Sequence, residues 1–290
     1  MSATPALKMP LRRRLAIHAC LLALCVPCLL PLGWMVSTSL KSETEIFPRE
    51  GQAASAFRPA QLVPQRPVWR NYPEALKTVP FAAYLRNTLM LCAFTVTGAV
   101  LSSAVVAYGF ARLRFRGREP LFALLLATMA LPGQVTMIPT FALFRALGWY
   151  GTFLPLIVPS FFGAPFYIFL MRQFFRTVPE ELAEAARIDG ASEWGIFWRI
   201  FLPLSKPALA TCALFQFFGA WNDFFGPLLY LNDPSRYTLA YGLQQFLSSY
   251  GGKWAALMAG ATLFTLPVIV VFFLAQKTFI QGIATTGSKG

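Results

Sequence analysis

The chain is short of charge and of histidine. Only 13% of its 290 residues are charged, against about 25% in soluble domains, and 56% are hydrophobic. The single histidine, His18, argues against histidine-ligated metal sites and most histidine-dependent catalysis. These shortages indicate a membrane protein with no metal site.

No cysteine lies in a setting suited to chemistry. The five cysteines all fall inside apolar runs: Cys20, Cys25, Cys28, Cys92 and Cys212. Cys25 and Cys28 have the CxxC spacing, but they lack the polar surroundings and further ligands of a redox or zinc site. We therefore expect buried, inert thiols and no cofactor.

Catalytic and nucleotide-binding patterns are also missing. No Ser/His, metal-ligand or paired-carboxylate constellation sits at membrane depth, and the GxxxxGK[ST] pattern is absent. We predict no catalytic residues and expect ATP hydrolysis to lie in partner subunits. The net charge of +13 would suit nucleic acid, but the basic residues sit in short segments beside apolar runs, as topology determinants do. We expect membrane lipid and no nucleic acid as a partner.

What the chain has in abundance is apolar sequence. About 20 apolar residues suffice to cross the hydrocarbon core as a helix. Six runs qualify, so we predict an all-α polytopic membrane protein with six transmembrane helices. The predicted spans are 15–38, 88–111, 120–144, 151–171, 208–231 and 255–276. The first is longer than the apolar region of a signal peptide, and we expect it to be retained.

Basic residues set the orientation. The short segment 112–119, "RLRFRGRE", holds four arginines, and dense basic loops mark the inner side. We therefore place both termini in the cytoplasm. The predicted parts are a cytoplasmic tail 1–14, a permease domain 15–276 with an outer loop 41–86 and a cytoplasmic loop 172–207, and a cytoplasmic tail 277–290. The outer loop is rich in proline, which fits a structured cap and a simple surface linker equally well.

Two spans contain breaks. "LPGQVTMIP" interrupts the third span and "WNDFFGPLLY" the fifth, and broken helices are tolerated where they line a cavity. Aromatic, amide and acidic side chains at membrane depth suit a sugar pathway. The candidates are Gln134, Trp221, Asn222 and Asp223. The alternative is helix packing, or capping near the Gly226–Pro227 break.

The loop 172–207 predicts two short helices joined by glycine. We expect Thr177 to cap the first helix, Pro179–Asp189, with Glu180 as its capping-box partner. Gly190 should end that helix as its C′ residue.

Ser192 should cap the second helix, "EWGIFWRIFL", which Pro203 should end. We expect a close-approach stripe on the first helix, formed by Leu182, Ala185 and Ala186. An aromatic stripe on the second is expected to lie at the membrane face or against neighbouring spans. It comprises Trp194, Phe197, Trp198 and Phe201. The two helices together would connect the transmembrane helices to a soluble partner. The alternative is an ordinary solvated loop.

"EAARIDGASEWGIFWRIFLP" resembles the EAA loop of the membrane subunits of bacterial ATP-binding-cassette importers. That pattern is E-A-A, three residues, G, nine residues, I, one residue, L-P. Seven positions match without a gap: Glu184, Ala185, Ala186, Gly190, Ile200, Leu202 and Pro203. Asp189 fits as well. The resemblance implies that these residues couple the chain to an ATPase.

Further segments, including "WNDFFGPLLYL" and "QKTFIQGIATTGSKG", resemble the carbohydrate-uptake branch of the maltose and glycerol-phosphate type. The chain is similar to the shorter, six-span subunit of the pair. The resemblance implies a type I importer fold in the bacterial inner membrane. It also implies a second permease subunit as a heterodimer partner, two ATP-binding-cassette ATPase subunits and an extracytoplasmic solute-binding protein.

Two alternatives stay open. An importer of the same architecture could carry a non-sugar solute. An ion-coupled secondary transporter is less consistent with the residues, because Asp223 is the one clear intramembrane acid and the loop motif would have no role.

Overall fold

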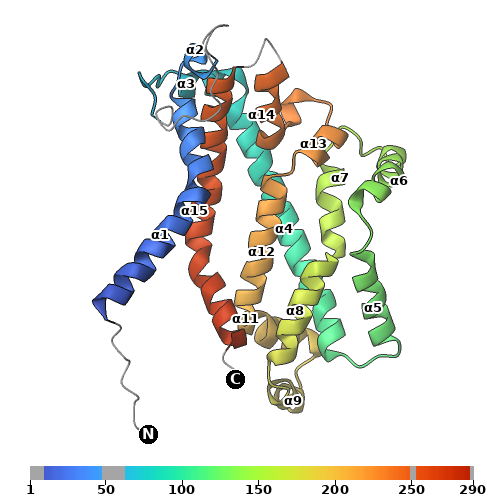
Figure 1. Ribbon diagram of the computed structural model, residues 1–290. Coiled ribbons are helices and arrows are strands. Elements are labelled where there is room, and N and C mark those ends of the chain that lie inside the picture. The colour runs from blue at the N-terminus through green and yellow to red at the C-terminus, as the bar shows by residue number, and fades with distance from the viewer. Residues whose placement is uncertain (1–9, 48–62, 249–252, 288–290) are drawn as a thin grey trace. The chain divides into compact units, whose positions relative to one another are not determined.

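A computed structural model describes residues 10–47, 63–248 and 253–287 (Figure 1). All regular elements in these ranges are helices. In chain order they are α1 Leu11–Ser39, α2 Glu43–Ile46, α3 Asn71–Thr78, α4 Phe81–Arg112, α5 Arg118–Thr128, α6 Gly133–Ala146, α7 Leu154–Ile157, η2 Val158–Phe162, α8 Pro165–Thr177, α9 Glu181–Ile188, α10 Glu193–Ile196, η3 Phe197–Phe201, α11 Leu202–Leu204, α12 Lys206–Trp221, α13 Phe225–Tyr230, η4 Pro234–Arg236, α14 Leu239–Ser248 and α15 Trp254–Gly287.

Four helical segments are long and apolar enough to cross a membrane: Leu11–Ser39, Phe81–Arg112, Leu154–Thr177 and Trp254–Gln276. Two bent pairs raise the number to as many as six within the described residues. The predicted all-α polytopic fold is confirmed.

The third predicted span, 120–144, is two helices rather than one. Helices α5 and α6 meet at a bend of 95°, which Figure 1 shows in green. Pro132 stands at the start of α6, where its missing N–H and its ring prevent the preceding helix from continuing. The fifth predicted span, 208–231, is also interrupted, because α12 ends at Trp221 and α13 begins at Phe225.

The chain forms two compact units, Met1–Val79 with Gln245–Leu263 and Pro80–Gln244 with Phe264–Gly290. In the first unit, the buried side chain of Asn71 donates hydrogen bonds of 2.8 Å to the carbonyls of Ser39 and Lys41. Glu43 accepts the backbone N–H of Ala255 at 2.9 Å. Part of the predicted outer loop 41–86 lies outside the described residues; its described part contains α2 and α3.

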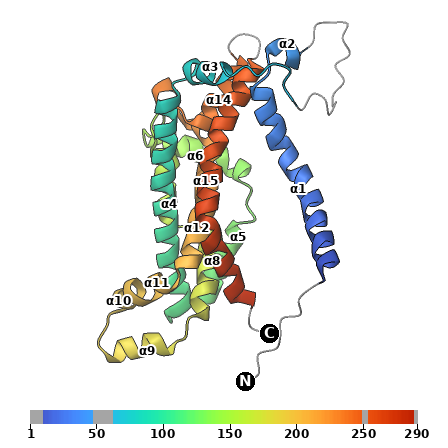
Figure 2. The same cartoon turned by 90° about the vertical axis from the view of Figure 1, so that its left-hand side faces the viewer.

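Helix α4 is the centre of the second unit, where it packs against α8, α12 and η2 (Figure 2). Its contact with η2 depends on glycine. A Cβ added at Gly98 would lie 2.6 Å from Oγ of Ser160 and 2.7 Å from the ring of Phe161, closer than real contacts allow. The absence of a side chain therefore lets the two segments touch.

The cysteines divide into two groups. Cys92 on α4 and Cys212 on α12 are buried, as expected. Cys20, Cys25 and Cys28 are exposed on α1, so the expectation of burial is wrong for them. They lie on a helix that exposes many apolar side chains as well, a surface that suits lipid.

Candidate functional site

The EAA loop connects α8 to α12 and consists of α9, α10, η3 and α11. Figure 2 shows these elements at the end of the second unit where α8 ends. The loop contributes several members of the main hydrophobic cluster of this unit, which also includes side chains of α4 and α8. The loop is therefore rooted in the bundle.

The start of α9 differs from the prediction. Thr177 does not cap it, because Thr177 is the last residue of α8 and its hydroxyl donates to the carbonyl of Phe174 at 2.7 Å. Val178 is extended, as expected of a residue that precedes a proline. Helix α9 begins after Glu180, which makes no side-chain capping bond. The error arose because α8 runs farther than the apolar run that predicted it.

The loop has two limbs: α9 is the first limb, and the helical segment Glu193–Leu204 is the second. The two capping predictions at the turn between these limbs are confirmed. Gly190 has φ +80°, in the left-handed region that glycine adopts readily, and it follows the last turn of α9. The Ser192 hydroxyl accepts the backbone N–H of Gly195 at 3.2 Å and so caps α10. Local chemistry therefore suffices to predict these two features of the turn.

The faces of α9 differ from the expected stripe. Ala183 is completely buried and Ala186 is half-buried against the cluster. Ala185 and Leu182 are exposed, and Ile188 is 87% exposed. The predicted stripe of Leu182, Ala185 and Ala186 is therefore wrong as a single face, because Ala186 turns toward the bundle while the other two point outward.

The second limb is buried along one side only. Phe197 and Phe201 are 1% and 0% exposed, whereas Trp194 and Trp198 are 60% and 48% exposed. The aromatic stripe thus divides into a packed pair and an outward pair. The two motif residues Ile200 and Leu202 are half-buried beside the packed pair.

The two packed phenylalanines are the first and last residues of a π-helical turn, η3. The N–H of Leu202 bonds to the carbonyl of Phe197, five residues back. Helix continues to Leu204, so Pro203 does not end it as predicted. Pro203 is the penultimate residue of this continuous helix, which ends one residue later at Leu204.

Arginines at the end of α4 and on α8 fix the base of the loop. Arg112 donates to the carbonyls of Phe175 and Val178, at the end of α8, and its guanidinium lies 4.7 Å from the ring centre of Phe201. Three segments therefore meet at Arg112. The sequence marked it only as one member of a basic loop.

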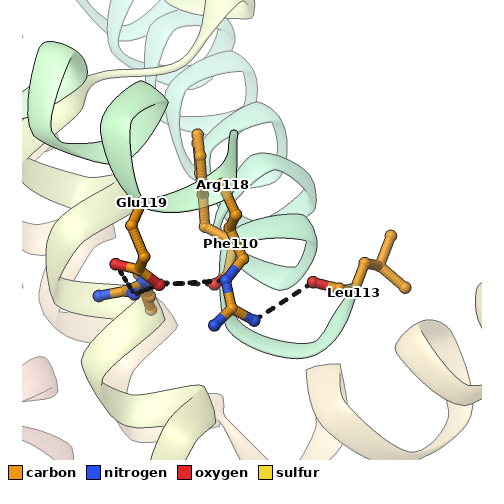
Figure 3. A network of polar contacts seen from close by, with 5 residues as sticks. Phe110, Leu113, Arg118 and Glu119 are labelled. Carbon is orange, nitrogen blue, oxygen red and sulfur yellow. Dashed lines mark hydrogen bonds and ion pairs between the residues drawn. The ribbon is translucent and has the colours of Figure 1, made fainter. Parts of the chain in front are cut away.

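A second polar network ties α5 to the same base. Arg172 of α8 is 6% exposed; it donates to the carbonyl of Phe110 at 3.2 Å and pairs with Glu119 at 3.1 Å. Figure 3 shows Glu119 also held by Arg118, which reaches the carbonyl of Leu113 at 3.4 Å. Two of the arginines of 112–119, Arg112 and Arg118, thus hold backbone in addition to supplying positive charge.

Glu193 joins both limbs of the loop to α4. Its Oε1 accepts from Nε of Arg187 at 2.8 Å and its Oε2 accepts from the hydroxyl of Tyr108 at 2.7 Å. The hydrogen bond from Arg187 lowers the pKa of the Glu193 carboxyl; burial opposes this and the Tyr108 bond reinforces it. The carboxylate is therefore the stable form at neutral pH.

The four candidates for a solute pathway have different surroundings. Trp221 is completely buried and donates to the carbonyl of Phe264 at 3.2 Å. Asp223 accepts the N–H of Gly226 at 2.9 Å, a local bond of the kind that the capping alternative expects. Asn222 is exposed and donates to the carbonyl of Phe218 at 2.8 Å, and Gln134 is exposed at the start of α6.

Comparison with known proteins gives matches along most of the chain. Residues 83–285 match the family model described as "Binding-protein-dependent transport system inner membrane component". The probable ABC transporter permease protein YurM of Bacillus subtilis (strain 168) is 34% identical over 261 residues, which cover 90% of this chain and 83% of that protein. The arabinooligosaccharides transport system permease protein AraQ of the same organism is 38% identical over 204 residues, 70% and 72% of the two chains.

The fold is similar to that of a solved structure as well. A chain of a bacterial ABC transporter involved in the import of the acidic polysaccharide alginate superposes with a TM-score of 0.76 at 26% identity, covering 95% of this chain and 100% of that one. The matched region includes the EAA loop and the helices that surround it. The chain belongs to the family of inner-membrane permease components of binding-protein-dependent ABC transport systems.

Proposed function

We propose that the chain forms half of the translocation pathway of an importer for a sugar or sugar derivative, and that its EAA loop couples it to an ATPase subunit. The observation that carries the coupling proposal is the difference in burial between the two limbs of the loop. The second limb packs its phenylalanines against α4 and α8, whereas α9, the first limb, leaves one side exposed. Relatives named for arabinooligosaccharides and alginate support the class of solute.

The exposed side of α9 is the part that enters a cleft on the ATPase. Glu184 supplies a charge contact and Ala185 permits close approach; both are exposed. Asp189 and Gly190 end the helix and set its direction. The remaining motif residues Ala186, Ile200, Leu202 and Pro203 form the root of the loop.

The transport cycle follows from this attachment. When ATP closes a pair of ATPase subunits, the docked α9 helices of two permease subunits are carried together, and the spans rock from inward-open to outward-open. A solute-binding protein on the outer side then delivers its cargo. Such coupling requires contacts that differ between the two states.

In this arrangement both termini and the loop 172–207 are cytoplasmic, as the basic segment 112–119 favours. The outer segment 41–86, with α2 and α3, meets the binding protein. Along the pathway, Gln134 and Asn222 contact the solute through exposed amides, while Trp221 and Asp223 shape the break beside them.

Uptake into membrane vesicles that contain the complete transporter tests this function. A panel of labelled maltose, arabinooligosaccharides, alginate oligosaccharides and amino acids is offered with ATP inside, or with a proton gradient and no ATP. We expect ATP-dependent uptake of one carbohydrate. Uptake driven by the gradient alone would overturn the ATPase coupling, and ATP-driven uptake of an amino acid only would overturn the class of solute.

An accessibility assay tests the orientation. The substitution Ile188→Cys places a thiol on the exposed side of α9, in a chain whose five native cysteines are replaced by serine. We expect a membrane-impermeant maleimide to label it in inside-out vesicles and not in intact cells. Labelling from the cell exterior would contradict a cytoplasmic loop.

A further inference from the structure

Helix α9 has little apolar anchorage of its own. It is eight residues long, below the length at which isolated helices are stable in water. Its one fully buried side chain is Ala183, and Ala186 is half-buried. One or two methyl groups provide only a small hydrophobic contribution to its position. Some other contact must therefore fix the direction in which α9 points.

The Glu193 carboxylate provides that contact. It stands at the first position of α10, and one oxygen takes the Arg187 guanidinium from the last turn of α9. The other oxygen takes the hydroxyl of Tyr108 from α4. A single side chain thus links the exposed limb of the loop to the central helix of the unit.

The α4 end of this link is rigid. Tyr108 is 5% exposed, and its ring lies 5.3 Å from that of Phe197, 5.2 Å from that of Phe201 and 6.3 Å from that of Phe175. These rings belong to the second limb and to α8. A force that reaches the Tyr108 hydroxyl therefore acts on the packed base of the loop and not on a mobile side chain.

We propose that Glu193 is a positioning residue for transport, which fixes the orientation of α9 and carries its displacement to α4 through Tyr108. The proposal rests on the function proposed above, because it assumes that a partner moves α9. The negative charge of the carboxylate strengthens both bonds, because hydrogen bonds to an ionised group are roughly twice as strong as neutral ones. Glutamine can accept from Arg187 and donate to the Tyr108 hydroxyl, so Glu193→Gln keeps the size of the side chain and weakens the link by removing its charge.

An ordinary surface ion pair would not have this role. The Arg187 and Glu193 side chains are 37% and 41% exposed, and ion pairs with that exposure contribute little to global stability. The expected signature is therefore not global unfolding. It is a local loosening of α9, accompanied by a loss of coupling between ATP hydrolysis and movement of the spans.

The first experiment measures amide hydrogen exchange of the full chain in lipid nanodiscs, without any partner. In Glu193→Gln we expect exchange of the α9 amides to rise about five-fold, with α4 and α8 unchanged. Tyr108→Phe and Arg187→Gln should act similarly, because each removes one end of the link. The double variant Arg187→Glu with Glu193→Arg should restore protection in part, since the two exchanged side chains would pair again and the new arginine could donate to the Tyr108 hydroxyl.

Matched controls separate the link from the loss of a charge. Glu181→Gln removes the same charge from α9, and Arg199→Gln removes an arginine from the second limb. Neither side chain makes a hydrogen bond or ion pair within the described part of the chain. Equal loosening in Glu193→Gln and Glu181→Gln would overturn the proposal. Faster amide exchange in Glu193→Gln that extends through α8 and η3 would overturn the proposal too. Glu193 would then stabilise the whole fold and not α9 alone.

The second experiment uses the assembled transporter and measures solute moved for each ATP hydrolysed. We expect Glu193→Gln to hydrolyse ATP at a rate near that of the unaltered protein but to move several-fold less solute, and the double variant to recover part of that loss. Unchanged coupling in a variant with a loosened α9 would refute the transport role. If the unaltered transporter shows no ATP-dependent uptake, the proposed function fails, while the exchange data still decide whether Glu193 holds α9.

Discussion

The two limbs of the EAA loop lie side by side in sequence and differ in what they bury. Helix α9 places one alanine fully inside and leaves Ile188 87% exposed. The segment Glu193–Leu204 places Phe197 and Phe201 inside, against Tyr108 and Arg112. Large rings anchor one limb and small side chains barely hold the other. The difference separates the part that must stay fixed from the part that can be moved by a partner.

The substitution Phe201→Ala should have the largest effect on this difference between the two limbs. Removing a fully buried ring that contacts Tyr108, Phe175 and the Arg112 guanidinium leaves a cavity, and should cost about 3–5 kcal/mol of stability. Reversible unfolding in mixed micelles measures this. The control Trp198→Ala removes a ring that is 48% exposed and should cost several-fold less. Equal costs would mean that the second limb is not the anchor.

The turn between the limbs gives the next effect. At φ +80°, valine at position 190 would be strained by about 1–3 kcal/mol, although no atom lies within 4 Å of an added Cβ. We expect Gly190→Val to insert in the membrane but to assemble poorly with the ATPase or to lose uptake. Gly190→Asn should be milder, because asparagine tolerates this conformation.

Gly195→Ala is the matched control for that turn. Gly195 has no positive φ, and the nearest atom to an added Cβ, the Ser192 hydroxyl oxygen, is 3.5 Å away. It should behave like the unaltered chain. Normal uptake by the Gly190→Val variant would contradict a role of this turn in coupling.

Opposite sides of α9 give a smaller and more selective effect. Ala183→Leu overpacks a buried site and should cost about 1–2 kcal/mol, seen as weaker micelle stability. Ala185→Leu changes an exposed site, so stability should be unchanged while co-purification with the ATPase falls. A reversed pattern would show that α9 presents the other side to its partner.

The smallest effect concerns pH. The hydrogen bond from Arg187 lowers the pKa of the Glu193 carboxyl. The stabilisation of α9 by this carboxylate is therefore fully present at pH values above the usual pKa of glutamate. It is lost only as the pH falls through the lowered pKa. Protection of α9, corrected for intrinsic exchange, should exceed that of Glu193→Gln from about pH 8 to about pH 5. Loss of the difference near pH 6 would contradict the assignment of the carboxylate.

Features encoded over a few neighbouring residues could be predicted from the sequence. The left-handed Gly190 and the Ser192 cap depend on side chains within four positions, and both are as expected. The break at Pro132 follows from the chemistry of proline, although the resulting bend of 95° does not. Length and apolarity likewise suffice for the membrane helices.

Features that depend on packing were missed or placed wrongly. Thr177 has the chemistry of a cap, but α8 extends through it. The burial of Ala186 in place of exposure depends on where α4 and α8 lie. The links from Arg112 to Phe175 and from Tyr108 to Glu193 span 63 and 85 positions, a distance at which no local pattern predicts a partner. The one signal that could have found Arg112 is its place as the last residue of a long apolar run.

The π-helical turn η3 has a consequence for how the loop could diverge among related chains. Each residue of an α-helix rotates the next by about 100°. The one extra residue in this turn therefore sets the angular phase between Glu193 at one end and Leu202 at the other. Deleting a single residue from Phe197–Phe201 would rotate Glu193 by about 100° away from Tyr108 while leaving the helix unbroken. The fixed spacing between Gly190, Ile200 and Leu202 in the motif therefore also fixes the direction in which Glu193 points.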